Sequence, residues 1–121
     1  MKPRSLRHRL EKSAKLLVII QKHAPETDCR IDEDKGEHGH VIVDFAGSGM
    51  SQRKLHALGT DLESKGYNFK RKRRPWLGQV TFTGTADERP SIVITYASAP
   101  DRLAIEEEAP AKAYSFSAGS S

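Results

Sequence analysis

Short segments in which every second residue is apolar limit what this chain can fold into more than any other feature. Successive side chains of a strand point to opposite faces, so each segment predicts a strand with one buried face. Apolar and polar residues alternate in this way over the stretch 27–32, and another predicted strand begins at residue 67 and continues through residues 70–74. The predicted inward positions are Cys29, Ile31, Val41, Val43, Phe45, Tyr67, Phe69, Val80, Phe82, Ile92, Ile94 and Tyr96.

Two further segments have helical periodicity. The first runs from about Ser5 to His23 and ends before Pro25, because a proline pushes the preceding residue out of the helical region. Its predicted apolar stripe consists of Leu6, Leu10, Ala14, Leu17 and Ala24, widened by Leu16 and Ile20. The second begins at a cap on Ser48 or Ser51 and ends near Lys65, with Gly66 suited to the left-handed residue that follows a helix. Its stripe is Leu55, Leu58 and Leu62.

The order helix, two strands, helix, three strands predicts an α+β fold. We expect two helices packed on one face of an antiparallel sheet of four to five strands, formed by hairpins joined edge to edge. This order resembles a circularly permuted ferredoxin-like arrangement. Residues 43–48 (VDFAGS) also align with residues 80–85 (VTFTGT), an echo that either an ancient duplication or coincidence would produce.

The 121 residues have the usual size of one domain. Hydrophobic residues make up only 36% of the chain, and the last two dozen positions contain few large ones. We therefore expect a single α+β domain over residues 1–97. Residues 98–121, rich in Ala, Ser and acidic side chains, are expected to be mostly disordered, with a helical turn around 103–108.

The lone Cys29 excludes an intrachain disulfide and favours a reducing compartment. The longest apolar run, residues 16–20, is far shorter than the ~20 residues that a membrane-spanning helix needs. We expect a cytoplasmic protein with no membrane partner.

Five consecutive cations, Lys70, Arg71, Lys72, Arg73 and Arg74, are the most unusual chemical feature. Phosphates attract such a run by Coulomb force and counterion release, and the nearby Trp76 offers a stacking face for an unpaired base. If the run is a strand, Lys70, Lys72 and Arg74 share one face, whereas Arg71 and Arg73 share the other. The first helix adds a second basic surface through Arg4, Lys15 and Lys22.

Other interpretations of the run remain open. Lysines on an exposed edge strand disfavour its pairing with another chain and so protect against aggregation. The run could also pair with the acidic turn 32–37, since residues 26–44 hold seven acidic and two basic side chains. A third interpretation is a protein partner anchored by Trp76 and the arginines, because both residue types are common at binding hot spots.

No segment completes a catalytic, cofactor or metal motif. His38 and His40, two apart in a strand, would face the same way, but no third zinc ligand has a recognised spacing. The loop Gly47–Ser48–Gly49 precedes a helix without completing a phosphate-binding pattern. Acidic neighbours should raise the pKa of Cys29, which disfavours a nucleophile, and His56 lies off the leucine stripe, as a surface histidine does. We predict no catalytic residues, no metal and no cofactor.

The sequence thus favours a small non-enzymatic nucleic-acid-binding accessory protein of the bacterial or phage type, which uses a basic hairpin. The alternative is a protein-interaction module such as an inhibitor or adaptor. An open sheet edge or an exposed Ile19 would support a homodimer.

Overall fold

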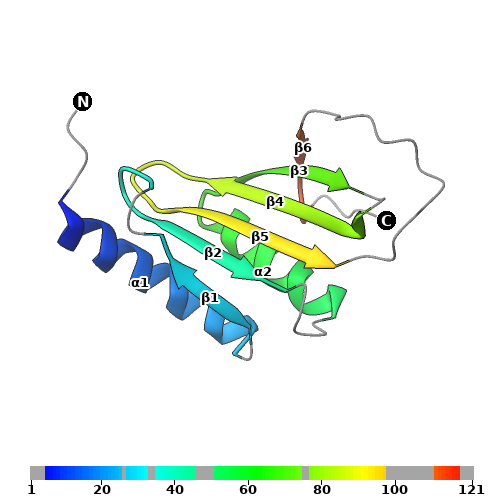
Figure 1. Cartoon of the computed structure of the whole chain (residues 1–121), viewed down its shortest axis with the longest axis horizontal. Coiled ribbons are helices and arrows are strands. Elements are labelled where there is room, and N and C mark those ends of the chain that lie inside the picture. Colours follow the sequence, from blue (N-terminus) through cyan, green and yellow to red (C-terminus); the bar gives the residue numbers. More distant parts are fainter. Residues whose placement is uncertain are drawn as a thin grey trace.

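The computed structural model describes residues 5–25, 27–32, 35–45, 51–74, 77–97 and 111–117. It contains two helices and one six-stranded sheet (Figure 1), which confirms the α+β class. The elements in chain order are α1 (Leu6–His23), β1 (Asp28–Ile31), β2 (His40–Asp44), α2 (Gln52–Ser64), β3 (Asn68–Arg74), β4 (Gln79–Thr85), β5 (Ser91–Ala97) and β6 (Lys112–Tyr114).

The strand order in the sheet is β1-β2-β5-β4-β3-β6, and the pair β2/β5 is parallel. The prediction of a purely antiparallel sheet with two hairpins joined edge to edge was therefore wrong. The hairpins β1/β2 and β3/β4 do form, but β5 lies between them and bonds to both β2 and β4. This position buries the inward side chains of β5, Ile92 and Ile94, on both flanks.

Both helices contribute to one core on the same face of the sheet. Leu16 and Ile20 of α1 and the three leucines of α2 join the inward residues of the strands in a single cluster. The alternation predicted for β2, β4 and β5 is confirmed, because Val41, Val43, Phe82, Ile92 and Ile94 are all buried. The sheet's other face is covered by neither helix (Figure 1).

The buried stripe of α1 is rotated relative to the prediction. Ser13, Leu16, Ile20 and Ala24 are buried, whereas Leu6 and Ala14 are exposed. The helix approaches the β1–β2 turn at Gly39, where an added Cβ would overlap the Ser13 hydroxyl and the Arg9 carbonyl. A close approach between small residues thus decides which side of α1 faces inward, and hydrophobicity alone did not predict it.

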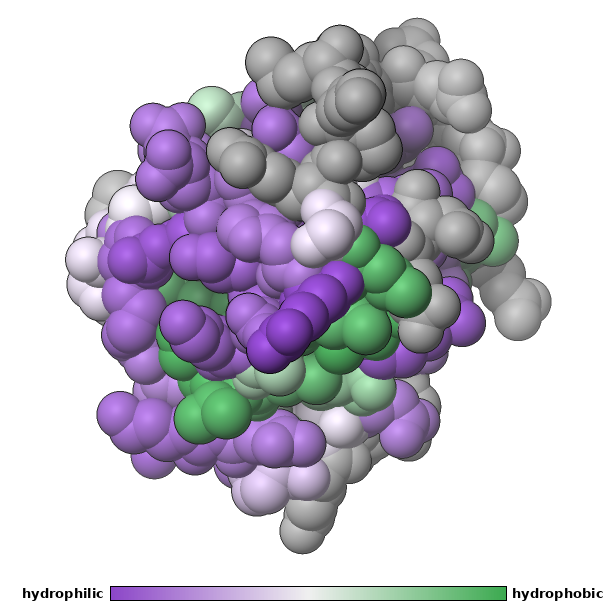
Figure 2. All heavy atoms as spheres, turned by 90° about the vertical axis from the view of Figure 1, so that its left-hand side faces the viewer, coloured by the Kyte–Doolittle hydropathy of each residue, from purple (hydrophilic) through white to green (hydrophobic). Residues whose placement is uncertain are grey.

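Exposed large hydrophobic side chains among the described residues are Leu6, Val18 and Leu77. Ile19, whose exposure would have supported a homodimer, is half-buried against the core, and it is Val18 that is 68% exposed. Figure 2 faces the end of the molecule at which α1 begins and shows apolar side chains open to the surface between hydrophilic ones. Within the part of the chain described here, no helix is both long and apolar enough to span a bilayer.

The second helix begins and ends as the sequence predicts. The Ser51 side chain caps it by accepting a hydrogen bond from the backbone N–H of Lys54. Gly66 follows it at φ 98°, in the left-handed region that favours glycine. The two helices are connected by His23 of α1, whose Nε2 lies 2.7 Å from Oδ2 of Asp61 in α2.

The expectation that residues 98–121 are mostly disordered does not hold for residues 111–117. Here β6 pairs antiparallel with β3, and Phe116 is only 2% exposed. Its ring lies among Phe69, Phe82 and Tyr114. The carboxylate of Glu63 accepts hydrogen bonds from the backbone N–H groups of Phe116 and Ser117 at 3.0 and 2.8 Å. The helical turn expected around 103–108 lies outside the described residues.

Candidate nucleic-acid interface

The basic run forms most of strand β3, and its register on β4 assigns each cation to a face of the sheet. Lys70, Lys72 and Arg74 lie opposite Thr83, Thr81 and Gln79. Arg71 and Arg73 lie opposite Phe82 and Val80. Directly opposed residues of an antiparallel pair share a face. The predicted alternation is therefore present, with Arg71 and Arg73 on the side that also carries the helices.

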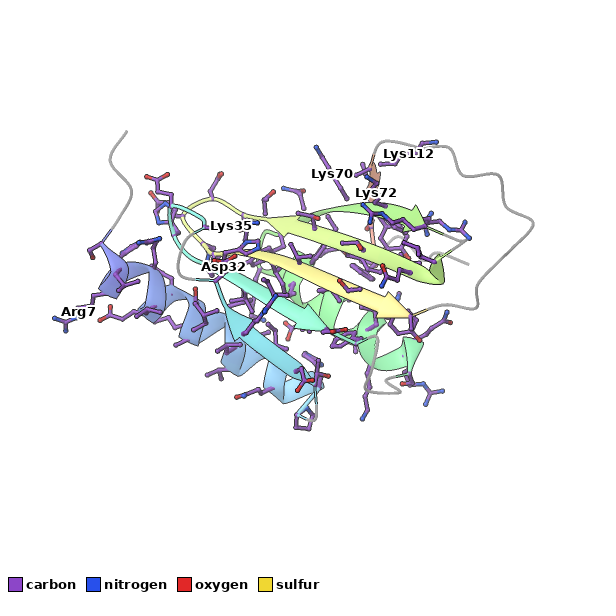
Figure 3. All side chains as sticks on the ribbon, viewed as in Figure 1. Arg7, Asp32, Lys35, Lys70, Lys72 and Lys112 are labelled. Atoms are coloured by element: carbon purple, nitrogen blue, oxygen red, sulfur yellow. The ribbon has the colours of Figure 1, made fainter. Side chains whose placement is uncertain are left out.

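The three cations on the open face stand beside uncharged polar side chains. Lys70 and Arg74 are exposed and Lys72 is half-buried. Figure 3 labels Lys70 and Lys72 on β3. Thr81 and Thr83 of β4 continue this face toward Thr95 and Val93 of β5. Hydroxyl groups beside lysines can donate to phosphate oxygens, so this face offers both charge and hydrogen bonds to a polyanion.

The two remaining cations line a pocket on the helix side of the sheet. It has a volume of about 640 Å³ and lies between the first turns of α2 and strands β3, β4 and β5. Arg53 and His56 of α2 contribute to its mouth, and Phe82, Tyr96 and Tyr114 contribute aromatic surface. The Arg71 guanidinium carbon lies 4.6 Å from the centre of the Tyr114 ring, a cation–π contact.

The described residues of the acidic turn form no ion pair with the basic strand. Within the described ranges, no carboxylate forms an ion pair with any of the five cations. Asp32 and Lys35 lie at the end of the sheet where β2 starts, whereas β3 points toward the opposite end (Figure 3). The strands β5 and β4 separate β2 from β3. The described part of the acidic turn is therefore too distant to act as the partner of Arg74.

The second basic surface does not merge with the first. Lys15 and Lys22 are exposed on α1, which packs against β1, β2 and α2, whereas β3 lies near the far edge of the sheet (Figure 1). Arg4, Trp76 and the loop Gly47–Ser48–Gly49 lie outside the described residues. Among the described residues, the basic surface away from α1 is therefore β3 with its two faces.

The two histidines of the acidic turn have different side-chain partners. His38 Nδ1 lies 2.9 Å from Nε2 of His8 on α1, whereas His40 Nδ1 lies 2.5 Å from the Ser91 hydroxyl of β5. The two side chains thus do not share a face, because β2 begins only at His40. Burial lowers the pKa of His40. Among the described residues, no three His, Cys, Asp or Glu side chains come together as metal ligands would.

Cys29 is half-buried on the core side of β1. Burial, followed by the neighbouring Asp28, raises the pKa of its thiol to about 11. The direction agrees with the prediction from its acidic neighbours. A thiol with this pKa is almost entirely protonated near neutral pH, so it is a poor nucleophile.

Sequence reasoning found the cations of β3 but missed the pocket that two of them line. Arg53 and His56 carried a weak signal, because both lie off the leucine stripe of α2. Phe116 and Tyr114 carried none, since an isolated aromatic residue in an Ala- and Ser-rich segment has no periodicity to place it.

In comparisons with family models, curated proteins and solved structures, nothing matches this chain.

Proposed function

We propose that this protein is a small, non-enzymatic nucleic-acid-binding accessory protein of the bacterial or phage type, acting in the cytoplasm. Strand β3 is its binding element, and Lys70, Lys72 and Arg74 contact the phosphate backbone from the open face of the sheet.

The observation that carries this proposal is the absence of ion-paired carboxylates around β3 within the described residues. Adjacent cations repel one another, and folding them onto one strand without neutralisation has a cost that a bound polyanion removes. On the sheet face that neither helix covers, β3, β4 and β5 lie side by side, and a strand of nucleic acid can lie across them.

Binding should depend strongly on salt, because each phosphate contact releases counterions. Three contacts predict a slope of log K against log salt of about −2 for a single strand and nearer −3 for a duplex. Fluorescence anisotropy with labelled single- and double-stranded DNA and RNA would measure it. Affinity that does not change with salt, or no binding at low salt, would contradict the proposal.

A matched pair of double variants locates the surface. Lys70→Gln/Lys72→Gln removes two charges from β3, and should weaken binding on the order of tenfold and make the slope less steep by about 1.4 for a single strand and about 1.8 for a duplex. Lys15→Gln/Lys22→Gln removes the same charge from α1 and should leave both nearly unchanged. Equal losses in the two variants would show that only net charge matters and would reject β3 as the site.

The alternative function, a protein-interaction module such as an inhibitor or adaptor, is favoured by one observation. Leu77, next to Trp76 at the tip of the β3–β4 hairpin, is 46% exposed. A protein partner lost on Trp76→Ala and retained in Lys70→Gln/Lys72→Gln would support this alternative over nucleic-acid binding.

A further inference from the structure

The pocket beside α2 combines features that a purely structural cavity does not need. Its volume of about 640 Å³ is within the range of small-molecule sites. Two arginines reach it from β3 and a third, Arg53, from α2. No Asp or Glu is among the described residues that line it. Three cations from two elements therefore converge on one space, with no counter-charge among the described residues that line it.

The inner wall of the same pocket is aromatic and apolar. Phe82 and Phe116 are buried, and Tyr96 and Tyr114 are half-buried around them. The Arg71 guanidinium carbon lies over the Tyr114 ring in a cation–π contact. An arginine held over a ring keeps N–H donors for other partners, and Arg71 lines the pocket, so it can donate to an anion bound there.

An arginine-lined mouth over an aromatic wall suits a ligand with an anionic group joined to a planar ring. Arginine binds phosphate with two parallel hydrogen bonds, and aromatic side chains stack on nucleobases with little preference for sequence. We propose that this pocket binds one nucleotide unit, with its phosphate on Arg71, Arg73 and Arg53 and its base against Tyr96 and Tyr114. The choice of a nucleotide rests on the proposed function.

The edge of β3 connects the pocket to the open face of the sheet. β6 pairs only with residues 69–71 of β3, and among the described residues no strand pairs with the outer edge of 72–74. Arg73 and Arg74 therefore project to opposite sides of a strand edge that no other described strand pairs with. A nucleic-acid strand held by Lys72 and Arg74 can pass around this edge and place one unpaired nucleotide in the pocket. A free mononucleotide has the same chemistry and is the other candidate ligand of the pocket.

Adjacent arginines provide a matched test. Arg73→Gln changes the pocket, and Arg74→Gln removes the same charge from the open face one residue away. Isothermal titration with adenosine 5′-monophosphate should show binding to the wild-type protein. Arg73→Gln and Arg53→Gln should each weaken it about tenfold, and Arg74→Gln less than twofold. Inorganic phosphate or adenosine alone should bind at least tenfold more weakly than the nucleotide.

Three results would overturn the inference: no binding of the nucleotide, equal losses in Arg73→Gln and Arg74→Gln, or binding of phosphate as tight as that of the nucleotide. The last would indicate a plain anion site. All three variants replace exposed side chains, and thermal unfolding checks that each remains folded.

A competition experiment separates the two sources of the nucleotide and the two proposals. If the nucleotide belongs to a strand, adenosine 5′-monophosphate should reduce the affinity of a labelled oligoadenylate, and so should Arg73→Gln. If the natural ligand is a free mononucleotide, neither should affect the oligonucleotide. An oligonucleotide that binds when the mononucleotide does not would reject the pocket and leave the proposed function standing. A mononucleotide that binds when the oligonucleotide does not would reject nucleic-acid binding and leave the pocket standing.

Discussion

The carboxylate of Asp61 in α2 makes two side-chain contacts, one at the end of its own helix and one to α1. Lys65, one turn further along α2, donates to Oδ1, and His23 of α1 lies against Oδ2. These two contacts hold the pKa of Asp61 down, at about 2. The folded state therefore binds the Asp61 proton more weakly than the unfolded chain does. This stabilisation is fully present above pH 4 and is lost as the pH falls toward 2.

Asp61→Asn tests this contribution. We expect a loss of unfolding free energy on the order of 1 kcal/mol at pH 7, because the amide keeps the shape but loses the charge. The difference from wild type should shrink between about pH 4 and pH 2, where the wild-type carboxylate is also neutralised. Urea denaturation at several pH values measures both effects.

The control is Glu11→Gln, which breaks the exposed Arg7–Glu11 pair of α1. Exposed pairs of this type contribute little, so its effect should stay within a few tenths of a kcal/mol. A constant difference between Asp61→Asn and wild type from pH 7 to pH 2 would show that the carboxylate's charge is not what matters.

The residues of β3 show what sequence alone could predict at this scale. The alternation of Lys70 and Arg71 follows from the two-residue period of a strand, so the division of the cations between two faces was predictable. The sequence could not show which of the two sets lines a pocket, because that depends on where α2 and the 111–117 segment lie.

Among the secondary-structure elements, the 111–117 segment depends most on a single side chain. Phe116 fills the space between α2 and the β3/β4 part of the sheet, and Gly59 on α2 makes room for it. A Cβ added at Gly59 would overlap the Phe116 ring. The helix carries glycine in its interior, where alanine is intrinsically better by about 1 kcal/mol, because the aromatic ring needs the space.

A double-mutant cycle tests this complementarity. Phe116→Ala should cost about 3–5 kcal/mol of unfolding free energy, and Gly59→Ala about 1–3 kcal/mol from overpacking. In the double variant the new methyl group faces the cavity left by the ring and no longer overlaps it. The combined loss should therefore fall short of the sum by at least about 1 kcal/mol. Strict additivity in chemical denaturation would contradict the contact.

Elements with strong periodicity were predictable from the sequence. Features that depend on contacts with distant segments of the chain were not. Five strands and α2 follow from alternation, a cap and a glycine stop. The rotation of α1 was mispredicted because Ser13 packs at Gly39, and a serine carries no hydrophobic signal. β6 was missed because its three residues are too few for a period to show.

For the whole molecule, the sheet order is the feature that local patterns could not provide. β2 and β5 pair although some fifty residues separate His40 from Ser91. Alternation predicts that Ile92 and Ile94 are buried, but it does not say between which strands. The sequence predicts the layers of this fold, and long-range packing decides the order within the sheet.

Hydrogen exchange should follow that order. Amides of β5, which is bonded on both sides, should exchange only through global unfolding and be the slowest. Amides of β6, an edge strand of three residues, should exchange at least tenfold faster through local opening. Mass spectrometry of peptides covering residues 91–97 and 112–117 makes the comparison. Equal protection of the two would mean that β6 opens only with the whole domain.

The docking of residues 111–117 has a consequence for binding energetics. The segment behaves as a ligand attached to its own receptor, so its effective concentration at the sheet is set by the chain that joins it to β5. Because Tyr114 and Phe116 form part of the pocket wall, a molecule bound in the pocket must be thermodynamically linked to this internal association. A bound molecule that favours the docked state strengthens the association of residues 111–117 with the sheet. Conversely, changing the chain between β5 and β6 would change the affinity for the bound molecule without altering any residue that touches it.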